Sequence, residues 1–194
     1  MKRAFVIAMP AEADAVRPLL KPSDRLYVSG IGKVNAAAAA MRAICEGAGE
    51  IWNAGLAGGF DPAMAVGDVY EIVSAVEYDF DLAALNGTCA GQLDERDSPF
   101  IPLARAGFFP GRVLATGDRF TDDGTDLPLL RELGADVRDM EGAAVAHVCE
   151  KCGVKCFAFK CISDVHGKGP MTGQFRGNSA ACLAALAAAL APVV

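Results

Sequence analysis

The sequence has no basic cluster that could neutralise a nucleic-acid backbone. Its 194 residues include 18 Lys and Arg against 24 Asp and Glu, which gives a formal net charge of −6 at pH 7. The basic residues are scattered along the chain, whereas nucleic-acid-binding proteins gather them on one face or stripe. We therefore expect no nucleic-acid partner.

Apolar runs long enough to span a bilayer are also lacking. The most apolar stretch, residues 180–194, falls short of the roughly 20 residues that a membrane-spanning helix needs, and we expect it to form a terminal helix on the core. The N-terminus begins like a signal peptide, but Glu12 and Asp14 end its short apolar run. We expect a buried first strand there and no membrane association.

A disulfide framework is missing as well. The seven cysteines are odd in number and follow no framework spacing, which indicates reduced thiols and a cytoplasmic location. Four of them lie near His147, but a predicted break between a helix and a strand separates them, and zinc requires four converging ligands. We expect buried thiols at Cys149, Cys152, Cys156 and Cys161, a core histidine, and no metal or other cofactor.

The chain does contain a regular alternation of strand-like and helical segments. The expected strands are 4–9, 26–29, 51–54, 113–116 and 155–162, with a longer strand pair over 68–78. The expected helices are 12–20, 33–46, 141–151 and 178–190. Residues 82–112 show little periodicity and are expected to form a mobile loop, with a disordered linker as the alternative. The alternation predicts one α/β domain over residues 1–194 with a largely parallel central sheet.

Two glycine-rich segments follow predicted strands, where open α/β sheets bind their ligands. In residues 30–35, Lys33 is followed by Val34 and not by Ser or Thr, which excludes a Walker-type phosphate loop. In residues 55–59, the glycines are expected to form a loop after the strand. A tight turn explains either segment taken alone.

Three carboxylates are more informative. Glu12, Glu141 and Asp164 each come just after a predicted buried strand, beside small or apolar residues where desolvation would raise their pKa. An acid that favours a helix N-terminus explains any one of them alone. Three at strand ends favour an active site.

Seven segments, in this order, resemble the nucleoside phosphorylase/nucleosidase superfamily, and within it the methylthioadenosine/S-adenosylhomocysteine nucleosidases. They are residues 8–12, 29–37, 53–59, 66–68, 116–120, 139–144 and 162–164. The resemblance implies a three-layer α/β/α fold with a mixed, largely parallel sheet. It also implies hydrolysis of a purine–ribose bond in a small-molecule nucleoside carrying a 5′ modification, and a homodimer.

The resemblance also implies roles for individual residues. Glu12 resembles the carboxylate that activates water, and Asp164, helped by Ser163, resembles the acid that protonates purine N7. Glu141 would accept hydrogen bonds from the ribose hydroxyls, and Phe120 would stack on the base. The substrate-binding residues that it implies are Met9, Phe120, Thr121, Met140, Glu141 and Ser163.

Departures from the family pattern leave alternatives open. Leu56 stands where these nucleosidases usually have Ser, and Lys160 where they usually have Arg. The pocket that holds the attacking water is therefore expected to differ from theirs. The chain between residues 81 and 116 is shorter than usual. Phosphorylases of the family place Arg where this chain has Glu12 and Asn53, which favours water over phosphate as the nucleophile.

Two further alternatives concern the substrate and the function. Residues 140–147 also resemble futalosine hydrolases, although those usually have Asn at the position of Asp164. A non-catalytic sensor of purine nucleosides is a different class. Retention of Glu12, Glu141 and Asp164 argues against a sensor, because binding alone needs no general acid and base.

Overall fold

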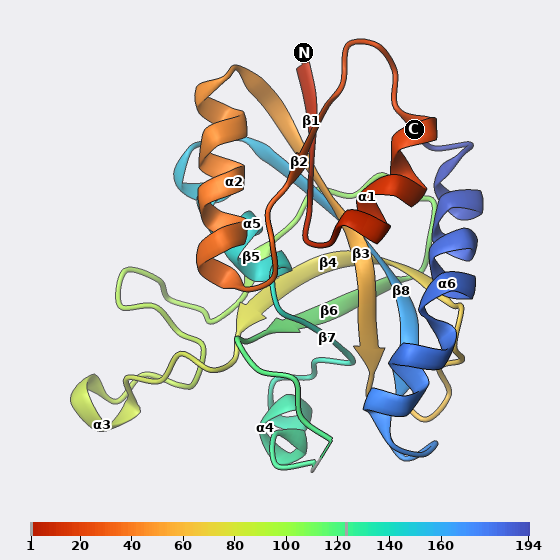
Figure 1. Ribbon diagram of the computed structural model, residues 1–194. Coiled ribbons are helices and arrows are strands. Elements are labelled where there is room, and N and C mark those ends of the chain that lie inside the picture. The colour runs from red at the N-terminus through yellow and green to blue at the C-terminus, as the bar shows by residue number, and fades with distance from the viewer. Residues whose placement is uncertain (1, 123) are drawn as a thin grey trace.

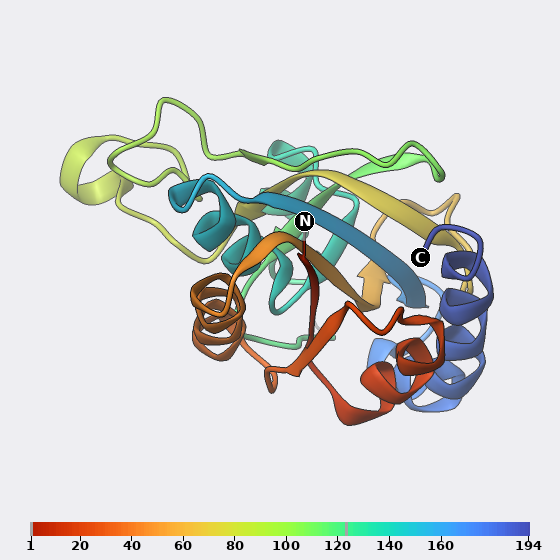
Figure 2. The same ribbon diagram turned by 90° about the horizontal axis from the view of Figure 1, so that it is seen from above.

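The computed structural model describes residues 2–122 and 124–194 and arranges them in three layers, with a curved sheet between helices (Figures 1 and 2). The strands are β1 (Lys2–Ile7), β2 (Arg25–Val28), β3 (Ala48–Gly59), β4 (Val69–Glu77), β5 (Ile101–Pro102), β6 (Gly111–Thr116), β7 (Val137–Asp139) and β8 (Lys155–Val165). The helices are α1 (Pro10–Val16), α2 (Lys33–Cys45), α3 (Ala83–Asn86), α4 (Leu127–Glu132), α5 (Gly142–Lys151) and α6 (Met171–Leu190).

The sheet is mixed. Its order is β2-β1-β3-β7-β6-β4-β5, and β8 pairs with both β3 and β4. The pairs β1–β2, β1–β3, β3–β8, β4–β6 and β6–β7 are parallel, whereas β3–β7, β4–β5 and β4–β8 are antiparallel. The expected three-layer fold with a mixed, largely parallel sheet is confirmed.

Side chains of β1 alternate between two hydrophobic clusters, as the period of two in a strand requires. Ala4 and Val6 belong to the cluster beneath α2 and α5, and Phe5 and Ile7 belong to the cluster beneath α1 and α6. All four are almost completely buried. Because both faces of the strand are covered by helices here, residues 4–7 are all apolar.

Three details of the sequence prediction are wrong. The expected glycine-rich loop at 55–59 is the end of β3, and the expected strand pair over 68–78 is the single strand β4. Helix α6 begins at Met171, seven residues before the expected start at 178. Gly173 and Gly177 lie in its first two turns, and glycine lowers helix propensity, which explains why the sequence pattern misses this part.

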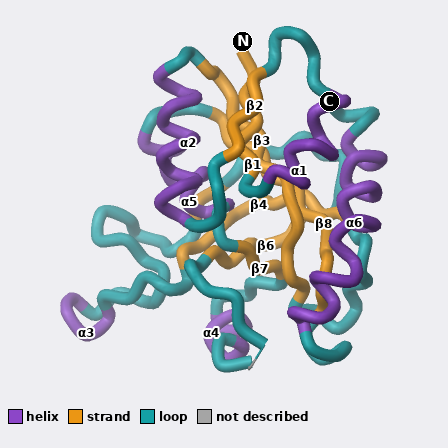
Figure 3. Tube along the Cα trace, viewed as in Figure 1, coloured by secondary structure: helices purple, strands orange, loops and turns teal. Residues whose placement is uncertain are grey.

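Residues 82–112 project from the sheet as loops with α3 near the tip (Figure 3). They carry little regular structure besides α3, β5 and the first two residues of β6. The mobility expected of this segment stays a prediction. Within the described residues, no helix is long and apolar enough to cross a membrane.

Candidate active site

The carboxyl ends of several strands open into one cavity of about 340 Å³. This cavity, hereafter the pocket, is lined by Ala8, Met9, Glu12, Ile31, Leu56, Ala57, Gly58, Phe120, Arg138, Asp139, Met140, Glu141, Ser163, Asp164, Thr172, Phe175 and Arg176. It is the location expected for a ligand site in an α/β sheet. All eight residues predicted for the site except Thr121 are among its lining.

The start of α1 fixes the position of Glu12. Pro10 occupies the first turn of α1, and the Met9 N–H donates to Glu12 Oε2 at 3.0 Å, a contact typical of helix starts. The Leu56 N–H donates to Glu12 Oε1 at 2.8 Å. Burial raises the pKa of Glu12, although these backbone donors and Lys160 act against the shift. The side chain is therefore held rigidly with an increased proton affinity.

Glycine in β3 makes room for this carboxylate. A Cβ atom at Gly55 would lie 2.6 Å from Glu12 Oε1, which is closer than van der Waals contact allows. Likewise, a Cβ atom at Gly58 would lie 2.9 Å from Asp164 Oδ1. Gly55 and Gly58 thus leave room for acidic side chains against the strand, which explains the presence of these two glycines inside β3.

Glu141 precedes α5 and reaches across to the loop before α2. The Gly32 N–H donates to Glu141 Oε1 at 2.9 Å. Burial and the negative charge of Asp139 raise the pKa of Glu141 to about 7. Glu141 therefore titrates close to neutral pH.

A buried ion pair lies behind Glu141. Lys160 Nζ is 2.7 Å from Asp139 Oδ2, and the two side chains are 2% and 1% exposed. Asp139 also accepts hydrogen bonds from Thr116 Oγ1 at 2.5 Å and from the Gly142 N–H at 2.8 Å. Burial acts to lower the pKa of Lys160, but Asp139 and Glu141 outweigh it and the pKa is raised. Lys160 therefore remains a cation.

Asp164 lies near the end of β8. Its Oδ2 accepts a hydrogen bond of 2.6 Å from Ser163 Oγ, whereas Oδ1 is buried and has no partner within the described residues. Burial raises the pKa of Asp164, and the Ser163 bond and Arg138 act against this. A buried oxygen without a partner is costly, and a ligand atom or a water molecule in the pocket would complete its hydrogen bonding.

Two aromatic side chains cover part of the pocket. Phe120 is 46% exposed and meets the ring of Phe175 edge to face, with centroids 5.9 Å apart. Thr121 does not line the pocket. Its Oγ1 and carbonyl oxygen accept hydrogen bonds from Arg138 at 3.2 and 2.9 Å, so that Arg138 fixes the loop that carries Phe120.

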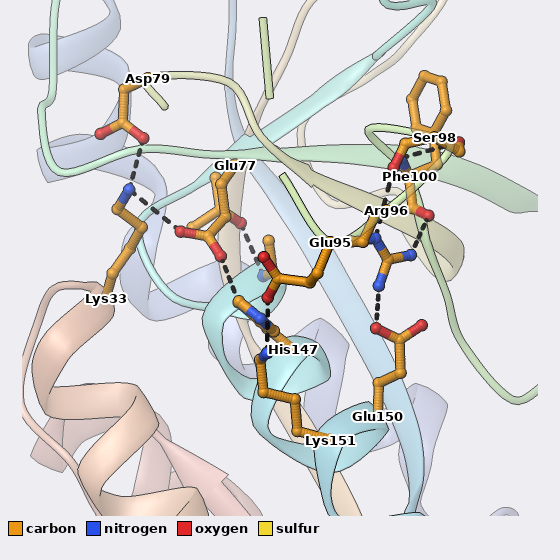
Figure 4. Close-up of polar contacts among 12 residues, drawn as sticks. Lys33, Glu77, Asp79, Glu95, Arg96, Ser98, Phe100, His147, Glu150 and Lys151 are labelled. Carbon is orange, nitrogen blue, oxygen red and sulfur yellow. Dashed lines mark hydrogen bonds and ion pairs between the residues drawn. The ribbon is translucent and has the colours of Figure 1, made fainter. Parts of the chain in front are cut away.

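His147 takes no part in the pocket. Its Nδ1 lies 2.9 Å from Glu77 Oε1, within a polar network that links α2, β4 and α5 (Figure 4). Lys33 joins the same network, with Nζ 3.3 Å from Glu77 Oε2 and 2.6 Å from Asp79 Oδ1. Separate pairs join Lys151 and Glu150 of α5 to Glu95 and Arg96 of the 82–112 segment. His147 is half-buried and its Nε2 has no partner within the described residues, so the expected core histidine with satisfied hydrogen bonding is wrong, whereas its absence from the pocket agrees with the expectation that it is no catalytic base.

The cysteines near His147 differ in their environment. Cys149, Cys156 and Cys161 are buried as expected, whereas Cys152 is only half-buried. No group of three or more potential metal ligands occurs within residues 2–122 and 124–194.

A model of the phosphorylase superfamily matches residues 25–194. The chain belongs to this superfamily. The family expected from the seven sequence segments is thereby confirmed.

Curated relatives of this superfamily member are nucleosidases. The 5′-methylthioadenosine/S-adenosylhomocysteine nucleosidase of Treponema pallidum is 34% identical over 180 residues, covering 73% of this chain and 66% of the relative. The aminodeoxyfutalosine nucleosidase of Campylobacter jejuni is 34% identical over 161 residues, covering 74% of this chain and 68% of the relative. The chain thus spans about two thirds of the length of these relatives.

Solved structures show the same fold. Futalosine hydrolase of Helicobacter pylori has a TM-score of 0.88 at 22% identity, covering 98% of this chain and 95% of the other. The methylthioadenosine/S-adenosylhomocysteine nucleosidase of Neisseria meningitidis, in complex with methylthio-immucillin-A, has a TM-score of 0.87 at 23% identity, covering all of this chain and 98% of the other.

Several pocket residues of this superfamily member were not predicted from the sequence. Arg138 lies in the short strand β7, and Thr172, Phe175 and Arg176 lie in the unpredicted start of α6. The spacing 172, 175 and 176 is the i, i+3, i+4 pattern of one helix face, and it is the signal that could have identified them.

Proposed function

We propose that this chain is a purine nucleosidase, an N-glycosyl hydrolase that cleaves a purine nucleoside modified at its 5′ position. The observation that carries the proposal is the pair of buried acids, Glu12 and Asp164, which line one pocket together with Glu141. The similarity to curated nucleosidases supports the same reaction.

In the proposed reaction, Glu12 acts as the general base. Its carboxylate takes a proton from water as the water oxygen forms a bond to C1′ of the ribose. The two backbone donors from Met9 and Leu56 hold both oxygens in place, and burial increases their basicity. A general base needs this fixed position and raised proton affinity.

Asp164 acts as the general acid. As the bond between C1′ and the purine nitrogen breaks, Asp164 gives its proton to N7, and the base leaves with the bonding electron pair. Burial raises the pKa of Asp164, which favours the protonated form, and the unpartnered Oδ1 is available to face N7. Phe120 would stack on the base, and Met9 and Met140 would contact the rest of the nucleoside.

Glu141 would bind the ribose diol. Its Oε1 already accepts from Gly32, and Oε2 can accept from the sugar hydroxyls. A negative charge beside the ribose also stabilises the positive charge that develops on the sugar, as in glycoside hydrolysis.

Water is a better nucleophile than phosphate in this pocket. Four acidic side chains line it, and Asn53, where phosphorylases have Arg, instead donates to the Val6 carbonyl at 2.9 Å. A phosphate dianion beside Glu12 would be repelled.

One experiment separates the candidate functions. The protein is incubated with a panel of purine nucleosides, including methylthioadenosine, S-adenosylhomocysteine and aminodeoxyfutalosine, with and without phosphate, and the products are identified by mass. Free ribose derivatives support hydrolysis, and ribose 1-phosphates would show phosphorolysis. The aminodeoxyfutalosine substrate stays the second candidate because of the Campylobacter jejuni relative. Binding without any product would show a sensor.

A homodimer is part of the proposal. Val28 in the edge strand β2 is 46% exposed, and Ile31, Val34 and Met41 in and before α2 are 52%, 79% and 44% exposed. A second copy covering this apolar face would lie beside the pocket, because Ile31 lines it. Val34→Glu is expected to give monomers in analytical ultracentrifugation, and an unchanged sedimentation coefficient would refute this interface.

We also propose a single domain and a cytoplasmic location, in keeping with seven cysteines that are all free.

A further inference from the structure

The pocket is lined by four acids but by only two cations, Arg138 and Arg176, and these two differ in their partners. Arg138 is 7% exposed and is paired with Asp126, with Nη1 3.0 Å from Oδ2. Arg176 is exposed, and within residues 2–122 and 124–194 it makes no ion pair, hydrogen bond or ring contact. A cation at the rim of an acidic pocket is thus left without a protein partner.

Helix α6 places Arg176 on the wall of the pocket. Thr172, Phe175 and Arg176 lie on one face of the helix and all line the pocket. Thr172 Oγ1 donates to Asp122 Oδ2 at 2.6 Å, which ties the first turn of α6 to the loop that carries Phe120. Arg176 lies one turn further along, roughly 6 Å from Thr172 along the axis. Since α6 packs against α1, this direction leads away from the base-binding loop and toward α1.

We propose that Arg176 binds an anionic group, in particular a carboxylate, at the end of the substrate's 5′ substituent. This inference rests on the proposed function and specifies its substrate class. With the purine at Asp164 and Phe120 and the ribose at Glu141, the 5′ substituent is the part of the substrate that is free to extend to the rim. Ile31 and Phe175 give that path apolar walls, suited to a short methylene or thioether chain. The planar guanidinium matches a carboxylate with two parallel hydrogen bonds.

Charge repulsion restricts where in the pocket an anionic group can bind. An anion placed next to Glu12 or Glu141 would be destabilised by like charge. Arg138 is already paired with Asp126, which leaves the Arg176 end of the pocket to accept an anion. The competing explanation is that Arg176 merely offsets the acidic field of the pocket. In that case it would affect charged and neutral substrates to the same extent.

The test compares Arg176→Met with the parent on two matched substrates, 5′-(3-carboxypropyl)thioadenosine and its carboxamide. We expect kcat/KM for the carboxylate to fall roughly 5- to 50-fold, a range between an exposed ion pair and a desolvated charge-assisted bond, with most of the change in KM. The carboxamide should change less than about twofold. Arg176→Lys should retain part of the preference, and Arg131→Met, at an exposed position in α4, should change neither substrate.

Each outcome decides one question. Equal losses on the two substrates, or no loss on either, would overturn the role of Arg176. If the parent cleaves neither substrate nor methylthioadenosine, the proposed function fails. Calorimetric binding of the same two nucleosides to the parent and to Arg176→Met would then test Arg176 alone. If the parent and the variant bound the carboxylate with equal affinity, the role of Arg176 would be overturned.

Discussion

Lys160 Nζ and Asp139 Oδ2 form a buried ion pair of 2.7 Å directly behind the pocket. The pair anchors Asp139, whose carboxylate also accepts from the Gly142 N–H at the first turn of α5. Glu141 is the residue that precedes this turn. Lys160 therefore acts on the position of the Glu141 carboxylate through Asp139, without lining the pocket itself.

We expect Lys160→Met to destabilise the protein strongly. The change leaves Asp139 as an uncompensated buried charge, which typically reduces the free energy of unfolding by about 3–5 kcal/mol. Urea denaturation of the parent and variant measures this. Lys160→Met combined with Asp139→Asn should recover part of the loss, and a double variant no more stable than Lys160→Met would contradict the pairing.

Glu12→Gln should abolish turnover and leave nucleoside binding nearly unchanged. The amide keeps the shape of the side chain but cannot take a proton from water, and a general base contributes a factor of about 10² to 10⁴. Single-turnover kinetics and calorimetric binding of a nucleoside give the two quantities. Activity close to that of the parent would remove Glu12 from the mechanism.

Glu141→Ala should weaken both binding and turnover through loss of charge-assisted hydrogen bonds to the ribose diol, each worth roughly 1.5–3 kcal/mol. A 2′-deoxy substrate already lacks one of these bonds. Its kcat/KM should therefore fall less in the variant than that of the ribonucleoside. Equal losses on both substrates would argue against contact with the diol.

Asp164→Asn tests the leaving-group step. A purine leaves poorly without a proton on N7, whereas a nitrophenyl riboside needs little help. We expect a large fall in kcat for the purine nucleoside and a small one for the nitrophenyl riboside. If both fell alike, Asp164 would only shape the pocket.

Stability should decrease as the pH rises between about 4.5 and 7. The pKa of Glu141 is 4.5 unfolded and about 7 folded, so the folded state holds more protons across this window. Stability therefore falls with pH until the folded group has titrated, by an amount on the order of 3 kcal/mol. The pKa values of Glu12 and Asp164 are also raised, so these two residues change the stability in the same direction. Glu141→Gln should flatten the measured dependence, and a slope as steep as that of the parent would contradict the assignment.

The strand and helix periodicity of the sequence was sufficient to predict the layers of the fold. Buried strand segments such as residues 4–7 of β1 are continuous in apolar residues, and the carboxylates after them stand out because a plain core needs none. The start of α6 and strand β7 were missed for different reasons. Glycines weaken the helical pattern of the first, and Arg138 and Asp139, both buried through tertiary ion pairs, give the second a polar sequence. Such pairs join residues far apart in the chain and leave no local pattern.

The glycines of β3 place a limit on protein engineering. Replacing glycine by alanine within a strand is a common route to a more stable protein, because it removes freedom from the unfolded chain. At Gly55 and Gly58 the added methyl group would displace the carboxylates of Glu12 and Asp164. A variant stabilised in this way would lose the positions of two pocket carboxylates, so glycine-to-alanine changes that stabilise this protein have to be made outside Gly55 and Gly58.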